Sequence, residues 1–193
     1  MRRTFAIVGL NIVSALFILS PSALADSNLS VSSPATVSLG NAFVVDVNIS
    51  SVTNLFDYQL DLAFNRGVLS ATGVTEGPFL STGGSTFFIP GTIDNVGGTI
   101  TFNADTLLGA VPGVSGNGTL IVFDFTAIAS GKSPLTIENA ILQDSTGVIL
   151  SDTVTNDSVT VQGTTPVPEP SGLMLLLTGG AAALMGFALK KGC

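Results

Sequence analysis

The sequence predicts an all-β protein built as one β-sandwich of about nine strands, with an apolar segment at each end of the chain. Three observations carry this prediction. Apolar residues recur with a period of two through the middle of the chain, turn residues interrupt them at short intervals, and no long helical pattern is visible between the two ends. Many short strands separated in this way are typical of a β-sandwich.

Residues 1–25 have the pattern of a secretory signal peptide. Two arginines follow the initiator methionine, an apolar stretch runs from Phe5 to Leu19, and Ala23 and Ala25 form a small-x-small cleavage site. Cleavage after Ala25 leaves a mature chain that starts at Asp26. The sequence therefore predicts an exported protein whose single folded domain spans residues 26–162.

Alternation shows which side chains of the two clearest strands face the core. The inward side chains expected are Phe43, Val45, Val47 and Ile49 in the first strand, and Tyr58, Leu60, Leu62 and Phe64 in the second. Asp57, Gln59 and Asp61 then point outward. The strands expected are 28–31, 43–50, 57–64, 68–75, 86–89, 99–105, 119–129, 134–142 and 158–162. The turns expected between them are 95–98, 113–118, 130–132 and 144–147.

Composition excludes several classes of function. From Asp26 to Thr165 there are 12 acidic and two basic residues, a net charge of −10, which repels the phosphates of nucleic acids. The chain has no histidine, and its one cysteine is Cys193. Ser-His-Asp and Cys-His catalysis are therefore excluded, as are zinc sites built on imidazole or thiolate. No disulfide can form within the domain, so its stability must come from the core.

Carboxylates do not form an expected catalytic or metal site. Asp57 and Asp61 lie on one strand face about 13 Å apart, too far apart to act together, so no catalytic residue is predicted and the protein is not expected to be an enzyme. Asp94 with Asn95, and Asp144 with Asp152, are the only sources of oxygen ligands for calcium. Asx residues in turns usually bind nearby backbone, so no metal and no cofactor is predicted.

The C-terminal segment predicts a membrane helix. A linker that covers residues 163–170 ends in Val167, Pro168, Glu169 and Pro170, and the prolines prevent a helix from starting earlier. The 18 residues 172–189 carry no charge and would reach roughly 27 Å as a helix, close to the thickness of a bilayer. The two lysines that follow favour the cytoplasmic side, so the domain should face outward.

This arrangement resembles the PEP-CTERM sorting signals of Gram-negative bacteria. In that family, Pro-Glu-Pro precedes one apolar helix and a short basic end, as it does in residues 167–193 here. The family's basic end is commonly rich in arginine, whereas this chain has two lysines. The resemblance implies recognition by an exosortase-type enzyme and a location at the membrane, the cell surface or the extracellular matrix, including its exopolysaccharide.

The folded domain resembles a cohesin domain. The segments that carry the resemblance, in order, are VVDVNI (44–49), LFDYQLDLAFN (55–65), VL (68–69), GNGTL (116–120), DFTA (124–127), NA (139–140) and DSTG (144–147). Cohesins are nine-stranded jelly-roll sandwiches that bind dockerin modules through one face. The resemblance therefore implies a non-catalytic adhesion module.

The resemblance also implies a binding face and a partner. The outward residues of the strand before the aromatic-Asp/Asn turn contribute to the dockerin face, and these positions are Asp57, Gln59 and Asp61, with Asn65 at the turn. The family's proline after that turn residue is Arg66 here. An alternative partner is an extracellular polysaccharide, since Phe79, Phe87 and Phe88 flank a glycine-rich loop, although loop phenylalanines more often fold under the sandwich edge.

Overall fold

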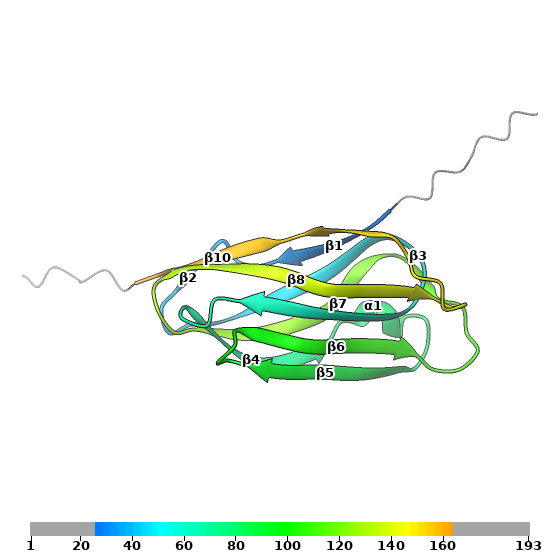
Figure 1. Ribbon diagram of the computed structural model, residues 1–193, viewed down its shortest axis with the longest axis horizontal. Coiled ribbons are helices and arrows are strands. Elements are labelled where there is room, and N and C mark those ends of the chain that lie inside the picture. The colour runs from blue at the N-terminus through cyan, green and yellow to red at the C-terminus, as the bar shows by residue number, and fades with distance from the viewer. Residues whose placement is uncertain (1–25, 164–193) are drawn as a thin grey trace, which may run out of the picture.

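The computed structural model describes residues 26–163, which form a sandwich of ten strands with one short helix (Figure 1). The elements are β1 (Ser27–Ser32), β2 (Thr36–Ser38), β3 (Ala42–Phe64), β4 (Leu69–Glu76), α1 (Pro78–Ser81), β5 (Thr86–Asp94), β6 (Thr99–Leu107), β7 (Val114–Ala127), β8 (Gly131–Asp144), β9 (Asp152–Thr155) and β10 (Asp157–Gln162). The predicted all-β sandwich is confirmed. The predicted signal peptide and the Pro-Glu-Pro segment with its apolar run lie outside the described residues. Within residues 26–163, no helix is long and apolar enough to cross a membrane.

Two layers of strands share the long strand β3. One layer has the order β9-β1-β3-β7-β4 and uses the first half of β3, whereas the other has the order β5-β6-β3-β8-β10-β2 and uses the second half. Pairing is antiparallel except for β1 with β9 and β10 with β2. In Figure 1, β5 and β6 lie along one long side of the sandwich, and β1 and β10 lie along the other.

The strand β3 stays buried on one side although it bends from one layer into the other. Its inward residues follow a period of two up to Ile49 and again from Tyr58, but Val52 and Leu55 between them are also buried, so the spacing there is three. Ser51 and Asn54 have positive φ angles of 57° and 61°, and the pairing register shifts at the same places. Each extra residue forms a bulge that turns the strand while its apolar side stays inward.

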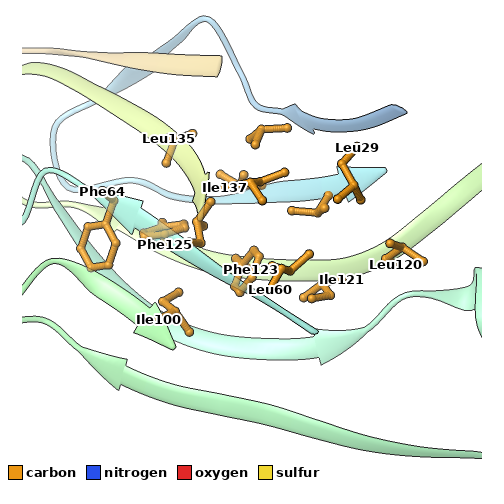
Figure 2. Packing of buried hydrophobic residues seen from close by; sticks show 14 of the residues in the cluster. Leu29, Leu60, Phe64, Ile100, Leu120, Ile121, Phe123, Phe125, Leu135 and Ile137 are labelled. Atoms are coloured by element: carbon orange, nitrogen blue, oxygen red, sulfur yellow. The ribbon is translucent and has the colours of Figure 1, made fainter. Parts of the chain in front are cut away.

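The core between the two layers is apolar and aromatic. Phe123 and Phe125 of β7 are fully buried, and the ring of Phe125 lies 5.9 Å from that of Phe43 and 5.1 Å from that of Phe64. Figure 2 shows Phe64, Phe123 and Phe125 with leucines and isoleucines of β1, β3, β6 and β8 between the layers. The Tyr58 hydroxyl donates a hydrogen bond of 2.8 Å to the Leu120 carbonyl and so joins the two layers through a polar contact.

The strand count differs from the predicted nine for local reasons. The predicted strands 43–50 and 57–64 are one strand, because the bulges at Ser51 and Asn54 keep it paired. The strands β2 and β9, with three and four residues, are too short to show a period of two. The turn predicted at 113–118 is wrong, since β7 begins at Val114 and Gly116 pairs with Val52. Glycines there accompany a bent strand and not a turn.

A binding face on the β5–β6–β3–β8 layer

The residues Asp57, Gln59 and Asp61 lie on the outer side of the second half of β3. They are half-exposed, and they alternate with the buried residues Tyr58, Leu60 and Leu62. β6 pairs with this half of β3 on one side and β8 pairs with it on the other, while β5 pairs with β6 beyond. The three side chains therefore stand in the middle of a four-stranded face.

Cross-strand pairing sets two rows of side chains across this face, which we call the binding face. Residues directly opposite each other in adjacent strands project to the same side, so each row is a continuous strip. One row consists of Ile89, Ala104, Gln59 and Ile141, and the other consists of Phe87, Thr106, Asp57 and Gln143. Gln59 is thus flanked by two apolar residues, whereas Asp57 lies between a threonine and a glutamine.

A shallow hollow of about 320 Å³ lies on the binding face. The residues that line it are Asp57, Tyr58, Gln59, Phe87, Ile89, Ala104, Asp105 and Thr106. Phe87 at its margin is 59% exposed, and partial burial raises the pKa of the Asp57 carboxyl. The hollow therefore combines an exposed aromatic ring with a carboxylate and an amide.

Asp61 holds the neighbouring strands in place. Its Oδ1 accepts a hydrogen bond of 2.7 Å from the Phe102 N–H in β6, and its Oδ2 accepts one of 2.7 Å from Asn139 Nδ2 in β8. Phe102 and Asn139 have positive φ angles of 59° and 50°, and each lies where the pairing with β3 shifts register. Both carboxylate oxygens are therefore engaged within the domain, in contrast to those of Asp57.

Asn65 is exposed at the turn after β3 and does not line the hollow. Its backbone N–H donates to Ser133 Oγ at 2.9 Å, and its Oδ1 accepts from the Gly67 N–H at 3.0 Å. Arg66, which stands where the family has proline, donates from its guanidinium to the Val96 carbonyl. The turn is thus tied both to β8 and to the β5–β6 turn, and the structure separates Asn65 from the other three predicted site residues.

The apolar half of the binding face was not among the predicted site residues. Phe102 is 52% exposed and Ile141 is 40% exposed, although simple alternation along 99–105 would place Phe102 inward with Ile100. The bulge at Phe102 reverses the alternation, so that Asn103 and Asp105 become the buried residues. The sequence signal for this exception is the Asn-x-Asp pattern at Asn103 and Asp105, because a regular strand does not normally bury two such polar residues.

Asp105 is a buried carboxyl group behind the binding face. Among the described residues, neither of its oxygens accepts a hydrogen bond, and burial, followed by the charge of Glu76, raises its pKa to about 7. The same two influences, burial and nearby carboxylates, raise the pKa of Tyr58.

Two of the three carboxylates considered for calcium, those of Asp94 and Asp144, serve their own turns, whereas Asp152 begins β9 opposite Ser27 of β1. Asp94 accepts hydrogen bonds from the backbone of Val96 and Gly97, and Asp144 accepts from Thr146 and the Val148 N–H, which holds the pKa of both carboxyls below the usual range. The side-chain amide of Asn95 accepts a hydrogen bond from the Ala71 N–H and donates one to the Ala71 carbonyl. In the part of the chain that is described, no group of three or more acidic residues has the geometry to hold a metal ion.

Several solved cohesins share this fold. A non-cellulosomal cohesin from the archaeon Archaeoglobus fulgidus matches with a TM-score of 0.57 and 18% identity over 72% of this chain and 92% of that chain. A cohesin from Clostridium acetobutylicum matches with a TM-score of 0.55 and 23% identity over 73% of this chain and 94% of that chain. The sixth cohesin of scaffoldin B from Acetivibrio cellulolyticus, solved in complex with the Cel5 dockerin, has a TM-score of 0.57 and 17% identity over 71% and 99% of the two chains.

The sequence itself decides the family. A comparison with proteins of curated function found no match. The model of the family described as Cohesin domain matches residues 27–161, which include all ten strands except the last residue of β10. The chain therefore belongs to the cohesin domain family.

Proposed function

We propose that this protein is a non-catalytic binding module whose binding face holds a dockerin-type protein partner. Cohesin domains are binding modules, and the Acetivibrio cellulolyticus cohesin that shares this fold was solved in complex with a dockerin. The binding face is flat enough for a protein partner, because its hollow is shallow and open. Protein recognition fits such a surface better than capture of a small molecule, which needs a deeper cavity.

The observation that carries the proposal is the exposure of apolar side chains on the binding face. Phe87, Phe102 and Ile141 are 59%, 52% and 40% exposed, and all three come from strands that surround Gln59. Exposed apolar side chains that lie together beside polar residues are typical of a surface that binds a partner. Burial of these side chains would supply the binding energy, and Gln59 and Asp57 would set the orientation.

Charge indicates the chemistry of the partner. Among residues 26–163 there are 12 acidic side chains and only two basic ones, so the domain attracts a basic surface. Asp57 lies in the hollow, and no group among residues 26–163 donates a hydrogen bond to its carboxylate, whereas both oxygens of Asp61 are engaged. The partner therefore presents an apolar ridge with a lysine or arginine near Asp57.

The substitution Gln59→Arg tests this assignment. It places a long cation in the centre of the binding face and should weaken capture of the partner by about tenfold or more, with little change in melting temperature. Val44→Arg is the matched control, because Val44 is 49% exposed on the same strand but in the opposite layer. Equal loss of capture in both variants, or a fall in melting temperature that accounts for the loss, would contradict the proposal.

The partner can be identified by its dependence on calcium. The immobilised protein is incubated with the secreted fraction of the source organism, and bound proteins are identified by mass spectrometry. We expect a protein with paired calcium-binding loops, which a chelator releases because such loops lose their fold without the ion. Retention of the module on polysaccharide alone, with no such protein enriched, would count against a dockerin-type partner.

Polysaccharide binding is the second candidate, and the exposed rings of Phe87 and Phe102 favour it. Sugar rings stack on exposed aromatic faces, although tryptophan is absent from the chain. Phe79, by contrast, belongs to α1 and is buried against the core, so it is not available. Affinity electrophoresis in gels that contain the organism's exopolysaccharide distinguishes the two, since a polysaccharide binder is retarded and Phe87→Ala then restores its mobility.

We also propose that the module is exported by residues 1–25 and sorted by an exosortase-type enzyme at Val167-Pro168-Glu169-Pro170. The support is the sequence pattern, with Ala23 and Ala25 at the cleavage site and the apolar run before the terminal lysines. Mass spectrometry of the surface-released form is the test. A C-terminus near Pro170 supports sorting into the surface or matrix of a Gram-negative bacterium, whereas an intact Cys193 found only in the membrane fraction makes the segment a plain anchor.

A further inference from the structure

Asp105 has no partner for its charge. Its side chain is 2% exposed, and within residues 26–163 neither carboxylate oxygen accepts a hydrogen bond. The two basic residues of this region are occupied elsewhere, because Arg66 binds the Val96 carbonyl and Lys132 lies beside Asp157. A buried ionised carboxylate without a donor or a cation is strongly unfavourable, so the group must be neutralised in another way.

Glu76, at the end of β4, is the group that Asp105 meets. The two side chains are within hydrogen-bonding reach, and Glu76 Oε1 also accepts a bond of 2.7 Å from Thr86 Oγ1 at the start of β5. Ionised carboxylates only accept hydrogen bonds, so two of them in contact cannot satisfy each other. One proton between them changes this, because a protonated carboxyl donates to its ionised neighbour.

Among residues 26–163, Tyr58 of β3 is the one other titratable group whose pKa the charges of this pair raise. β3 contributes Tyr58, whose hydroxyl donates to the Leu120 carbonyl, and Asp57, which points to the outer side. β5 carries Asp94 only at its far end, where it binds its own turn, and α1 has no titratable residue. β7 contributes Asp124, which lies over Gly73, three residues before Glu76 in β4.

We propose that Asp105 and Glu76 share one proton, and that this proton holds the edge strand β5 against the sandwich and so keeps the binding face in shape. The shared proton follows from the buried carboxyl pair alone. Its effect on binding rests on the proposed function of the binding face, because β5 contributes Phe87 and Ile89 to the hollow. Among the described strands, β5 pairs with β6 only, so it is the element that is free to respond.

The direction of the pH response follows from the two states of Asp105. When β5 moves away, water reaches the carboxyl, which then loses its proton above about pH 4; in the closed state its pKa is raised to about 7. The closed state therefore binds one more proton between these values. The equilibrium constant for opening of β5 rises by up to about tenfold per pH unit between about pH 4 and about pH 7. Above about pH 7 it no longer changes with pH.

Hydrogen exchange of the full chain at a series of pH values tests the pair without any partner. After correction for the intrinsic pH dependence of exchange, protection of the β5 and β6 amides in the wild type should fall by up to about tenfold per unit between about pH 4 and about pH 7. In Asp105→Asn, the amide stays neutral and donates to Glu76, so this protection should be independent of pH. Asp46→Asn removes a carboxylate from the outer side of the opposite layer and should keep the wild-type slope.

Three results would overturn the shared proton. They are a wild-type slope of zero, an unchanged slope in Asp105→Asn, and protection that a chelator abolishes at acidic pH and calcium restores, which would mean that a bound cation neutralises the pair. If Asp105→Asn does not fold, Glu76→Gln provides the same test, since its amide can donate to Asp105 in the same way.

Capture of the calcium-loop partner at the same pH values tests the consequence for binding. The wild type should capture less as the pH rises toward 7, and Asp105→Asn should capture equally at all values and more than the wild type at about pH 8. If protection of the β5 amides falls with pH but capture by the wild type does not change with pH, the proposal that the shared proton controls binding is overturned. Absence of capture at every pH, by wild type and variant alike, contradicts the proposed function while the exchange slope still establishes the shared proton.

Discussion

Asp61 and Asn139 are joined by a hydrogen bond of 2.7 Å from Asn139 Nδ2 to Asp61 Oδ2, across a bulge in β8. The other oxygen of the same carboxylate accepts from the Phe102 N–H across a bulge in β6. A residue that the family resemblance assigned to partner binding therefore secures two irregular strands at once. Its contribution to the binding face is in the first place to hold its shape.

The substitution Asp61→Ala should lower the free energy of unfolding by about 2 kcal/mol, because two charge-assisted hydrogen bonds to residues with positive φ are lost. Urea denaturation measures this change. The Asp57 carboxylate accepts no hydrogen bond within the described domain, so Asp57→Ala on the same strand should stay within about 0.5 kcal/mol of the wild type. Equal destabilisation by both substitutions would show that Asp61 does not clamp the bulges.

The substitution Tyr58→Phe should lower the free energy of unfolding by about 1 to 2 kcal/mol. It keeps the ring in the core but leaves the buried Leu120 carbonyl without the hydroxyl that it accepts from. The slope of unfolding free energy against urea should not change, since the surface buried in the sandwich is the same. An unchanged midpoint would mean that the Gly77 N–H, which also donates to this carbonyl at 2.8 Å, satisfies it without the hydroxyl.

The substitution Gly77→Ala should destabilise the domain by about 2 to 4 kcal/mol. A Cβ at Gly77 would lie within 2.6 Å of the Thr119 carbonyl and the Leu120 backbone, which are parts of β7 that cannot move aside without breaking the sandwich. Gly147→Ala is the control. Its φ is +80° but no atom lies within 4 Å, so only the backbone conformation disfavours alanine and the loss should be about 1 kcal/mol. Thermal melting of both variants decides between steric and conformational causes.

Acid should destabilise the domain through its turns. Backbone donors hold the pKa of Asp94 and Asp144 below the usual range, so their contribution is present above about pH 4 and is lost as the pH falls through the lowered values. In Asp144→Ala, the loss of unfolding free energy below about pH 4 should be shallower than in the wild type. Asp46→Ala, which removes a carboxylate outside any turn, should keep the wild-type slope.

The sequence was sufficient for the fold class and the family, because both depend on alternation within strands and on the order of short motifs. It also placed Asp57, Gln59 and Asp61 on the outer side, since the second half of β3 alternates regularly. Simple alternation failed along β6, where one bulge reverses the two sides and brings Phe102 out and Asp105 in. Bulges depend on contacts between strands that are distant in the sequence, such as the contacts of Asp61. The period of apolar residues along one strand carries no information about these contacts.

The two ends of the described chain lie at opposite ends of the long axis of the sandwich, with β1 starting at one and β10 finishing at the other (Figure 1). β10 runs along that axis, and it is paired with β8 through residues 157–161 and with β2 through residues 160–162. A pull on the chain beyond Gln162 along the direction of β10 would strain these hydrogen bonds in shear, all together, and not open them one at a time from an end. The sandwich is therefore built to resist tension applied from its C-terminal side.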